Sequence, residues 1–455
     1  MVSKTHRRAA YAVAFSFALN VAAFAGDTTV LLDPSPNPKG ALGSAIVLTP
    51  EWILVGAPGK RLTFGASTVS SGAILRWARD ASGAPVGAPT IIPPSGQKAG
   101  ERFGLAFDAG ATTLVVGSPG YTAVAPSFAV GRVRVLSLGT GAVLNSLAPP
   151  SAGPGSPQYG AAVATDDLTI VAGAPDRVLA NLITGSVYVL NKNGPSWSVP
   201  ANGILSAPVT APYVGFGSAV GLTDAEVLVG APGGISLPQA QHGRVYIYDR
   251  DALGTPTTTL LAPTPTLGDR FGTAIATEGT LLAVGAPGND CDDGVVHLYR
   301  KRGDSYTFEA TLTAPDSLGW TGFGSDVAID RERVAVGSGG IKTEWELGFR
   351  AAVFRKAGDS WTLEATAAGN EAPAAGAVAL DAAGLAFSDP LDRGGAVRYV
   401  ALPRLPDLDF DGVVGPTDLG LLLGAWGTNT VWADLDASGE VGAADLGVLL
   451  GAWSD

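Results

Sequence analysis

Two kinds of short apolar segment recur along most of the chain. In the first kind, as in residues 281–286 (LLAVGA), the apolar residues are continuous, which is typical of a strand buried on both faces. In the second kind, as in residues 243–248 (GRVYIY), apolar and polar residues alternate, which predicts a strand with one buried and one exposed face. Glycine and proline bound both kinds of segment. The pattern therefore predicts an all-β fold over most of the chain.

Three short sequence marks repeat in phase seven times. An aromatic–glycine pair comes first, and it recurs at nearly regular intervals. A Gly-Ala-Pro tripeptide or a variant of it then ends the buried strand, and a further glycine precedes the alternating strand. The clear pairs are Phe103-Gly104, Tyr159-Gly160, Phe216-Gly217, Phe271-Gly272 and Phe323-Gly324, and the degenerate pairs are Leu42-Gly43 and Ala375-Gly376. Repeats of this length are typical of folds in which each repeat forms one structural unit.

Each repeat has room for four strands, and four-stranded units repeated around an axis form a β-propeller. Residues 29–34 (TVLLDP) are similar to residues 259–263 (TLLAP), which precede the fifth repeat. A segment in this position is expected to be the outer strand of the unit before the repeat. No earlier unit exists for the strand at residues 29–34 to join. We therefore expect this strand to complete the seventh unit and to close the ring, which would leave no open sheet edge.

The aromatic–glycine pair followed by Gly-Ala-Pro resembles the FG-GAP repeat, the unit of the seven-bladed propeller at the head of integrin α-subunits and of many secreted bacterial proteins. The resemblance covers residues 28–401. It implies a seven-bladed propeller of four-stranded blades over residues 26–401. Members of this family bind proteins or glycans, and some are joined to catalytic domains in the same chain. The resemblance therefore implies a protein or glycan ligand on the propeller.

Residues 1–25 have the organisation of a secretory signal peptide. They open with a basic segment (KTHRR), continue with mostly apolar residues 9–24 and end in Ala-Phe-Ala at residues 23–25, the pattern that signal peptidase cleaves. After residues 1–25 are removed, no apolar segment is long enough to cross a bilayer. We expect a secreted protein, in the extracellular space, at the cell surface or in the periplasm.

The end of the chain has a different composition. Residues 407–455 contain nine acidic residues and no Lys, Arg or His. Segments 407–418 and 434–445 share the pattern D-L-D-x-(D/S)-G-x-V-G-x-x-D, which is that of an EF-hand-type calcium loop with Asp in place of Glu at position 12. The predicted ligands are Asp407, Asp409, Asp411, Val413 and Asp418 in the first loop, and Asp434, Asp436, Ser438, Glu440 and Asp445 in the second, with Val413 and Glu440 contributing backbone carbonyls. The sequence thus predicts two bound Ca²⁺ ions, with the weaker site in the second loop, where Ser replaces an Asp.

A short helix is predicted after each calcium loop. Its apolar residues have the spacing i, i+3, i+4 and i+7, and the same set follows both loops: Leu419, Leu422, Leu423 and Trp426, then Leu446, Leu449, Leu450 and Trp453. We expect the two stripes to pack against each other as a core. The entering helix of an EF-hand is missing from both units.

A duplicated loop–helix unit of this length resembles a type I dockerin, the small all-α module that binds cohesin domains in secreted bacterial assemblies. The resemblance covers residues 407–455, with residues 402–406 as a linker, and it implies a cohesin-like partner. Loop positions 10 and 11, which are often Ser/Thr in cellulosomal dockerins, are Pro416-Thr417 and Ala443-Ala444 here. This departure leaves the identity of the partner open.

Composition narrows the classes of function. The formal net charge of −12 argues against a nucleic-acid partner, because such a partner requires a basic face. A disulfide within the chain is excluded, because Cys291 is the single cysteine. After signal removal only His242 and His297 remain, and both are expected to be strand or surface residues rather than catalytic ones. No catalytic or cofactor-binding motif is found in the sequence.

One acidic cluster lies within the repeats, at Asn289, Asp290, Asp292 and Asp293, where some FG-GAP proteins carry a calcium loop. Its spacing differs from that of the loops after residue 406, so both a metal site and a solvated turn are open interpretations.

Three functions remain for the whole chain. They are a non-catalytic binding propeller docked through the dockerin-like module, a polysaccharide-degrading component with O-glycosyl hydrolase chemistry, and a purely structural surface protein. The poverty in His and the docking module favour the first.

Overall fold

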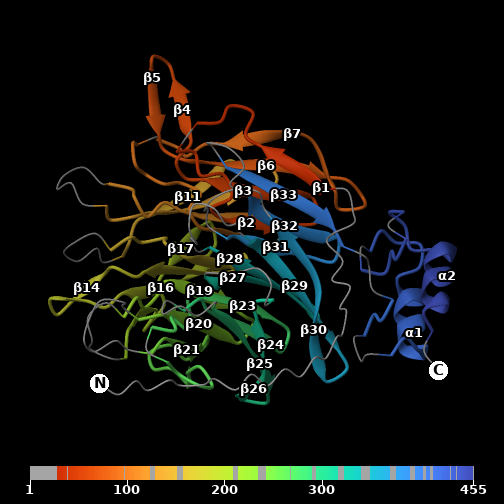
Figure 1. The fold of residues 1–455 in the computed structure, drawn as a ribbon. Coiled ribbons are helices and arrows are strands. Elements are labelled where there is room, and N and C mark those ends of the chain that lie inside the picture. The colour runs from red at the N-terminus through yellow and green to blue at the C-terminus, as the bar shows by residue number, and fades with distance from the viewer. Residues whose placement is uncertain are drawn as a thin grey trace, which may run out of the picture.

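Seven β-sheets are arranged around a central axis, with two short helices beside them (Figure 1). The computed structural model describes residues 28–37, 39–96, 98–122, 129–150, 157–208, 214–233, 242–266, 268–288, 294–315, 322–339, 349–368, 376–389, 395–402, 406–409, 413–430, 432–436 and 438–453. The predicted signal peptide at residues 1–25 lies outside these residues. The seven-bladed propeller predicted from the repeats is confirmed.

The first three blades run from the axis outward in chain order. Blade 1 consists of β2 (Ile46–Leu48), β3 (Trp52–Ala57), β6 (Ala73–Arg79) and β7 (Pro85–Ile92). Blade 2 consists of β8 (Phe107–Ala109), β9 (Thr113–Gly117), β10 (Val133–Ser137) and β11 (Val143–Leu147). Blade 3 consists of β12 (Val163–Thr165), β13 (Thr169–Ala174), β16 (Ser186–Asn193) and an outer strand in two pieces, β17 (Ser196–Ser198) and β18 (Ile204–Ser206). Two hairpins extend from the loops after the second strands: β4 (Arg61–Phe64) with β5 (Ser67–Ser70), and β14 (Val178–Leu179) with β15 (Leu182–Ile183).

The remaining blades have the same antiparallel order. Blade 4 consists of β19 (Ala219–Leu222), β20 (Glu226–Ala231), β21 (Arg244–Asp249) and β22 (Thr258–Leu260). Blade 5 consists of β23 (Ala274–Glu278), β24 (Leu281–Ala286), β25 (Val295–Arg302) and β26 (Ser305–Thr313). Blade 6 consists of β27 (Phe323–Asp330), β28 (Arg333–Ser338), β29 (Phe349–Ala357) and β30 (Ser360–Ala368). Blade 7 consists of β31 (Val378–Leu380), β32 (Gly384–Asp389), β33 (Ala396–Ala401) and β1 (Thr28–Leu32).

The N-terminal strand closes the ring, as the sequence predicts. β1 pairs antiparallel with β33, so the first strand of the chain is the outer strand of the last blade. Just after β1, the carboxylate of Asp33 accepts hydrogen bonds at 2.6 Å from the ammonium group of Lys60, which belongs to blade 1. The side chains of both residues are almost fully buried. A buried ion pair of this kind is costly to break, because the remaining charge would have no partner.

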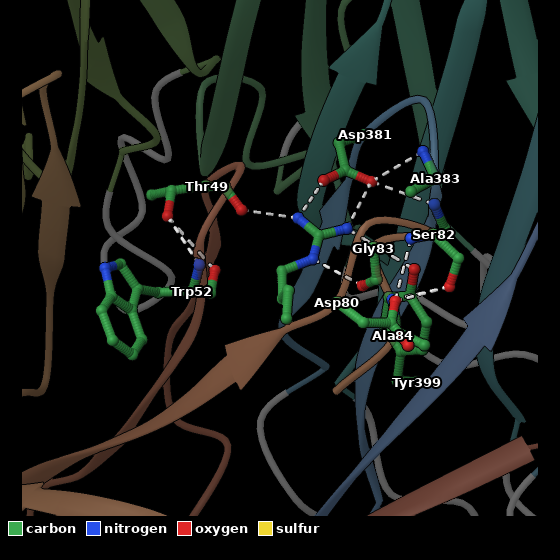
Figure 2. A network of polar contacts seen from close by, with 11 residues as sticks. Thr49, Trp52, Asp80, Ser82, Gly83, Ala84, Asp381, Ala383 and Tyr399 are labelled. Carbon is green, nitrogen blue, oxygen red and sulfur yellow. Dashed lines mark hydrogen bonds and ion pairs between the residues drawn. The ribbon is translucent and has the colours of Figure 1, made fainter. Parts of the chain in front are cut away.

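A second contact joins blades 1 and 7 at the end of β6 (Figure 2). The guanidinium of Arg79 donates to both carboxylate oxygens of Asp381, at 2.5 and 3.2 Å, and to the carbonyl oxygens of Thr49 and Gly83. Asp381 lies in the turn between β31 and β32, far from Arg79 in the sequence. Arg250 and Asp166 form an equivalent ion pair between blades 4 and 3. Ion pairs between a cation at the end of the third strand and the turn of the preceding blade therefore reinforce two joints, one of which closes the ring.

The motif glycines lie where neighbouring blades touch. A Cβ atom added to Gly173 of the blade 3 Gly-Ala-Pro segment would lie 2.0 Å from the carbonyl oxygen of Gly217, the glycine of the next aromatic–glycine pair. The N–H of Gly217 also donates to Gly230 within its own blade, at 2.9 Å. The same close approach recurs from Gly56 to Gly104, from Gly117 to Gly160, from Gly230 to Gly272, from Gly285 to Gly324 and from Gly337 to Gly376. The repeats are therefore recognisable in the sequence because six of the seven joints between blades require these glycines. At the joint of blades 7 and 1, Ser388 takes the place of the first glycine.

We expect Gly173→Ala to destabilise the propeller. A β-carbon at this position would collide with backbone, which cannot move away as a flexible side chain can, so the free energy of unfolding should fall by about 1–3 kcal/mol or more. Gly139→Ala is the control, because a Cβ there has no heavy atom within 4 Å. Thermal unfolding of the two variants measures the difference. Equal melting temperatures would show that the joint between blades 3 and 4 adjusts without cost.

The third strands of the blades differ from the expectation of one exposed face. In β21 four consecutive residues, Val245 to Tyr248, are buried, and β10 and β25 show the same pattern. Blades stack face to face, so the alternate polar-tipped side chains are covered by the neighbouring blade. Tyr188, for example, is buried in a cluster with Val115, Val133 and Val135 of blade 2. The alternation of more and less exposed residues that is expected of a strand with one solvent-exposed face is seen in the outer strand β11 instead.

Candidate metal centres

The first predicted calcium loop brings three carboxylates together. One oxygen each from Asp407, Asp409 and Asp418 lies within 4.8 Å of the others. Asp418 is buried, and its Oδ1 accepts hydrogen bonds from the backbone N–H groups of Leu408 and Asp409 at 2.5 and 3.0 Å. Asp411 lies outside the described residues, and Val413 lies on the exposed surface of the loop.

The second loop, at residues 434–445, repeats this geometry. Asp434, Asp436 and Asp445 again place carboxylate oxygens within 4.8 Å of one another. Ser438 contacts the group: its N–H donates to Asp434 and Asp436 at 2.9 and 3.0 Å, and its hydroxyl donates to the carbonyl oxygen of Glu440 at 3.1 Å. Hydrogen bonding by Ser438 lowers the pKa of Asp436, so this carboxylate stays ionised.

Each position-12 aspartate also begins a helix. Asp418 accepts from the N–H of Gly415 at 2.7 Å at the start of α1 (Pro416–Gly424), and Asp445 accepts from the N–H of Gly442 at 2.6 Å at the start of α2 (Ala443–Gly451). A carboxylate at this position satisfies a free backbone donor and interacts favourably with the helix dipole. The same side chain thus links the loop, the helix and the carboxylate group.

The donor set fits a hard divalent cation. Ca²⁺ binds carboxylate and carbonyl oxygens at about 2.3–2.6 Å, so oxygens on opposite sides of the ion are separated by about 5 Å. The carboxylate oxygens of each loop are within 4.8 Å of one another. Residues 407–455 contain no Lys, Arg or His that could neutralise these charges. Three mutually repelling carboxylates in a segment that has no basic residue of its own are a favourable environment for a cation.

The two apolar stripes are only partly a core, which corrects the sequence prediction. Leu422 and Leu449 are fully buried, and they pack with Leu408, Val414, Ala425, Ala433, Leu435 and Val441. Leu423, Trp426, Leu450 and Trp453, which the spacing assigns to the same core, are exposed. Successive helix residues point about 100° apart, and a module of this size covers only the row through Asp418, Leu422 and Ala425.

The exposed apolar residues form a repeated surface that the sequence analysis missed. Leu421 and Val448, on the other side of the buried row, are exposed as well. The surface, called here the helix face, consists of Leu421, Leu423, Trp426, Val448, Leu450 and Trp453. Its members are related in pairs by the same sequence interval as the two loops. This repeat was the signal in the sequence from which the exposed surface could have been predicted. A core alone does not require that every apolar residue of one helix has a counterpart in the other.

The propeller contacts the module at its second loop, away from the helix face. The guanidinium of Arg331, in the turn between β27 and β28, lies 5.3 Å from the centre of the Trp432 ring. Ala81 of blade 1 lies close to Gly439. The helices stand beside the propeller in Figure 1.

None of the described helices is long and apolar enough to cross a membrane.

A channel of about 710 Å³ lies between the innermost strands of the seven blades. Two carboxylates line it, and each is bonded to the innermost strand of the next blade: Asp108 accepts from the N–H of Thr165 at 2.8 Å, and Asp326 accepts from the N–H of Val378 at 2.9 Å. Burial raises the pKa of both aspartates to about 6. These hydrogen bonds show that the two aspartates join neighbouring blades.

The predicted acidic cluster at residues 289–293 lies outside the described residues.

The two histidines among the described residues lie in or beside blade strands, as expected. His242 is partly buried just before β21, the third strand of blade 4. His297 is buried in β25, where its Nδ1 lies 3.0 Å from the hydroxyl of Thr311 and its ring packs against Phe271 and Phe308. No hydrogen bond between a histidine and a carboxylate occurs within the described ranges. Burial lowers the pKa of His297 to about 4.

We expect His297 to make the propeller less stable in acid. The unfolded histidine, with a pKa of about 6.5, takes up a proton as the pH falls, whereas the folded one resists protonation until about pH 4. The stabilisation that comes from keeping His297 neutral is therefore present above pH 6.5. As the pH falls to 4, the free energy of unfolding decreases by about 2–3 kcal/mol because this stabilisation is lost. Asp108 and Asp326 act in the opposite direction over the same range, so the test is a difference. The unfolding free energy of wild type minus that of His297→Gln should fall by this amount between pH 7 and pH 4, and a constant difference would contradict the burial argument.

No protein-family model matches the chain, and no curated protein sequence matches it. The case for a function therefore depends on the geometry of the propeller and of the two carboxylate groups.

Proposed function

We propose that this chain is a secreted, non-catalytic binding protein made of two parts. The propeller of residues 26–401 holds a protein or glycan ligand. The dockerin-like module of residues 407–455 binds two Ca²⁺ ions and attaches the propeller to a cohesin-like partner in an extracellular or cell-surface assembly. The single observation that carries the proposal is the duplicated carboxylate group, each copy placed at the start of a helix with an exposed apolar face.

Calcium binding and partner binding are coupled in this proposal through the helices. Asp418 and Asp445 belong both to the carboxylate groups and to the helix starts, so a bound ion would fix the position of each helix. The helix face contains two tryptophans and four aliphatic residues. Exposed apolar side chains of this size mark interaction sites, and tryptophan is enriched at the centres of interfaces.

Direct binding to cohesin domains tests the docking part. The full chain is passed over a panel of immobilised cohesin domains in calcium and in chelator. We expect binding to at least one domain in calcium only. The variant Leu423→Ser/Leu450→Ser should bind at least about tenfold more weakly, because both copies of the helix face lose an apolar contact. Leu168→Ser, which removes an exposed leucine from the propeller, is the control.

Failure to bind any domain in calcium, or equal binding in chelator, would contradict docking through the module. The non-catalytic part has its own test. Residues 26–401 are incubated with plant, algal and bacterial polysaccharides, and reducing ends are followed. Release above a heat-treated control that is abolished by a single Asp or Glu substitution would favour the polysaccharide-degrading alternative.

A further inference from the structure

The segment of the chain that contains blade 2 carries a net positive charge. Between Asp80 and Asp166 the chain has four basic residues, Lys98, Arg102, Arg132 and Arg134, and two acidic ones, Glu101 and Asp108. Asp108 lines the central channel, where its carboxylate is bonded to backbone N–H groups. A local excess of positive charge therefore remains at the other end of the blade, in a protein of net charge −12.

Three of these cations surround one aromatic ring. The ammonium of Lys98 lies 4.8 Å from the centre of the Tyr121 ring, and the guanidinium carbons of Arg132 and Arg134 lie at 3.8 and 5.8 Å. Tyr121 itself is buried. We call this group, Lys98, Tyr121, Arg132 and Arg134, the basic corner. Its residues come from the loop before blade 2, from the loop after β9 and from the edge of β10.

The single acid of the basic corner is already engaged. Glu101 forms a buried ion pair with Arg134, which also donates to the hydroxyl of Ser118 at 2.8 Å. Arg134 is therefore a fixed structural cation. Glu101 is thus already paired with Arg134. Among the described residues, Lys98 and Arg132 form no ion pair with a carboxylate.

Lys98 and Arg132 are held in place with donor capacity to spare. The ammonium of Lys98 donates to the carbonyl oxygen of Thr122 at 2.8 Å, and Arg132 donates to the hydroxyl of Ser146 at 3.3 Å. Both acceptors are neutral, and both side chains are only partly buried. Stacking on Tyr121 limits the freedom of the guanidinium, so less entropy is lost when it binds an anion. An oxyanion placed here would reduce the repulsion between the cations and would accept charge-assisted hydrogen bonds.

We propose that the basic corner binds an oxyanion, the carboxylate or sulfate substituent of an acidic saccharide, through Lys98 and Arg132. An acidic protein is a less suitable ligand. A stable protein interface covers about 800 Å² on each partner, so an acidic protein would have to extend well beyond the corner on a protein of net charge −12, whereas one saccharide substituent needs only the corner. This inference depends on the proposal that the propeller is a binding unit, and it names the class of ligand.

Calorimetric titration of the full chain at constant ionic strength tests the site. The probes are a tetramer of galacturonic acid, its methyl ester, sodium sulfate and a tetraglutamate peptide. We expect the acidic tetramer to bind, the ester not to bind, and sulfate to compete with the tetramer. Arg132→Gln and Lys98→Gln should each raise the dissociation constant of the tetramer about tenfold, because each removes a charge-assisted hydrogen bond. Lys192→Gln, which removes an exposed lysine from blade 3, should leave it unchanged.

Several outcomes would overturn the proposal. They are no binding of either the tetramer or sulfate, equal binding of the ester, and equal loss of affinity in the Lys192 control. Binding of sulfate without the tetramer, or of tetraglutamate as tightly as the tetramer, would overturn the assignment to a saccharide. Lys98→Gln removes no stacked guanidinium, so it keeps the site testable if Arg132→Gln fails to fold. None of these outcomes bears on calcium-dependent docking, which the cohesin experiment tests separately.

Discussion

Deletion of residues 26–35 should unfold the propeller rather than trim its end. The deletion removes β1, so blade 7 loses its outer strand, and β33 becomes an open edge that can pair with other chains. It also removes Asp33 and Ser35, which both accept hydrogen bonds from Lys60. Loss of one partner of a buried ion pair costs about 3–5 kcal/mol. We expect a large fall in melting temperature, together with aggregation.

A chain that begins at residue 28 is the matched control, because it keeps all of β1. Differential scanning calorimetry and size-exclusion chromatography compare the two proteins. Asp33→Asn separates the two causes, since it keeps the strand and removes the charge that faces Lys60. If the chain without residues 26–35 melts and elutes as the control does, the ring is held closed by the other contacts between blades 1 and 7, such as the pair of Arg79 and Asp381.

Chelation of calcium should melt the C-terminal module. Asp418, Asp434 and Asp445 are each buried within a group of three carboxylates, and no basic residue lies in residues 407–455. Among the described residues, the core that would oppose their repulsion has eight buried members. A domain of about 50 residues buries too little apolar surface to be stable without a metal or another constraint. Binding of the ion to the folded state alone would supply the missing stability.

Circular dichroism of residues 401–455 measures this effect. We expect a helical spectrum in calcium and its loss in chelator. Asp436→Ala should weaken the second site and Asp409→Ala the first, while Asp455→Ala, which changes an acidic residue beyond both loops, serves as the control. Equal helix content in calcium and in chelator would show that the carboxylates are stable without a cation.

The number of blades could be predicted from the sequence because most joints between blades require glycine, and the closure of the ring because residues 29–34 resemble an outer strand. Gly173 must approach the carbonyl of Gly217, and a glycine recurs at this position in six of the seven repeats, with Ser388 in the seventh. The burial of the third strands could not be predicted in the same way. Their alternating pattern is typical of a half-exposed strand, and only the stacking of neighbouring blades covers side chains such as Tyr246.

The carboxylate groups were predictable because the members of each group belong to a single short loop, as in Asp434 to Asp445. The helix face was missed although its residues repeat in the sequence, since the spacing of Leu422 and Leu423 does not show how wide the core of a small module is. The basic corner was not predictable either. Lys98 and Arg132 are well separated in the sequence, and they meet only because two loops of one blade converge on Tyr121.

The central claim is that two calcium sites in residues 407–455 support docking, and the number of ions bound tests it most directly. Calcium is titrated by calorimetry into the metal-free full chain, with Asp418→Asn and Asp445→Asn in parallel. The account predicts two ions for the wild type, with the first loop binding more tightly, and one ion for each variant. No binding at micromolar to millimolar calcium, or two ions that persist in both variants, would contradict it.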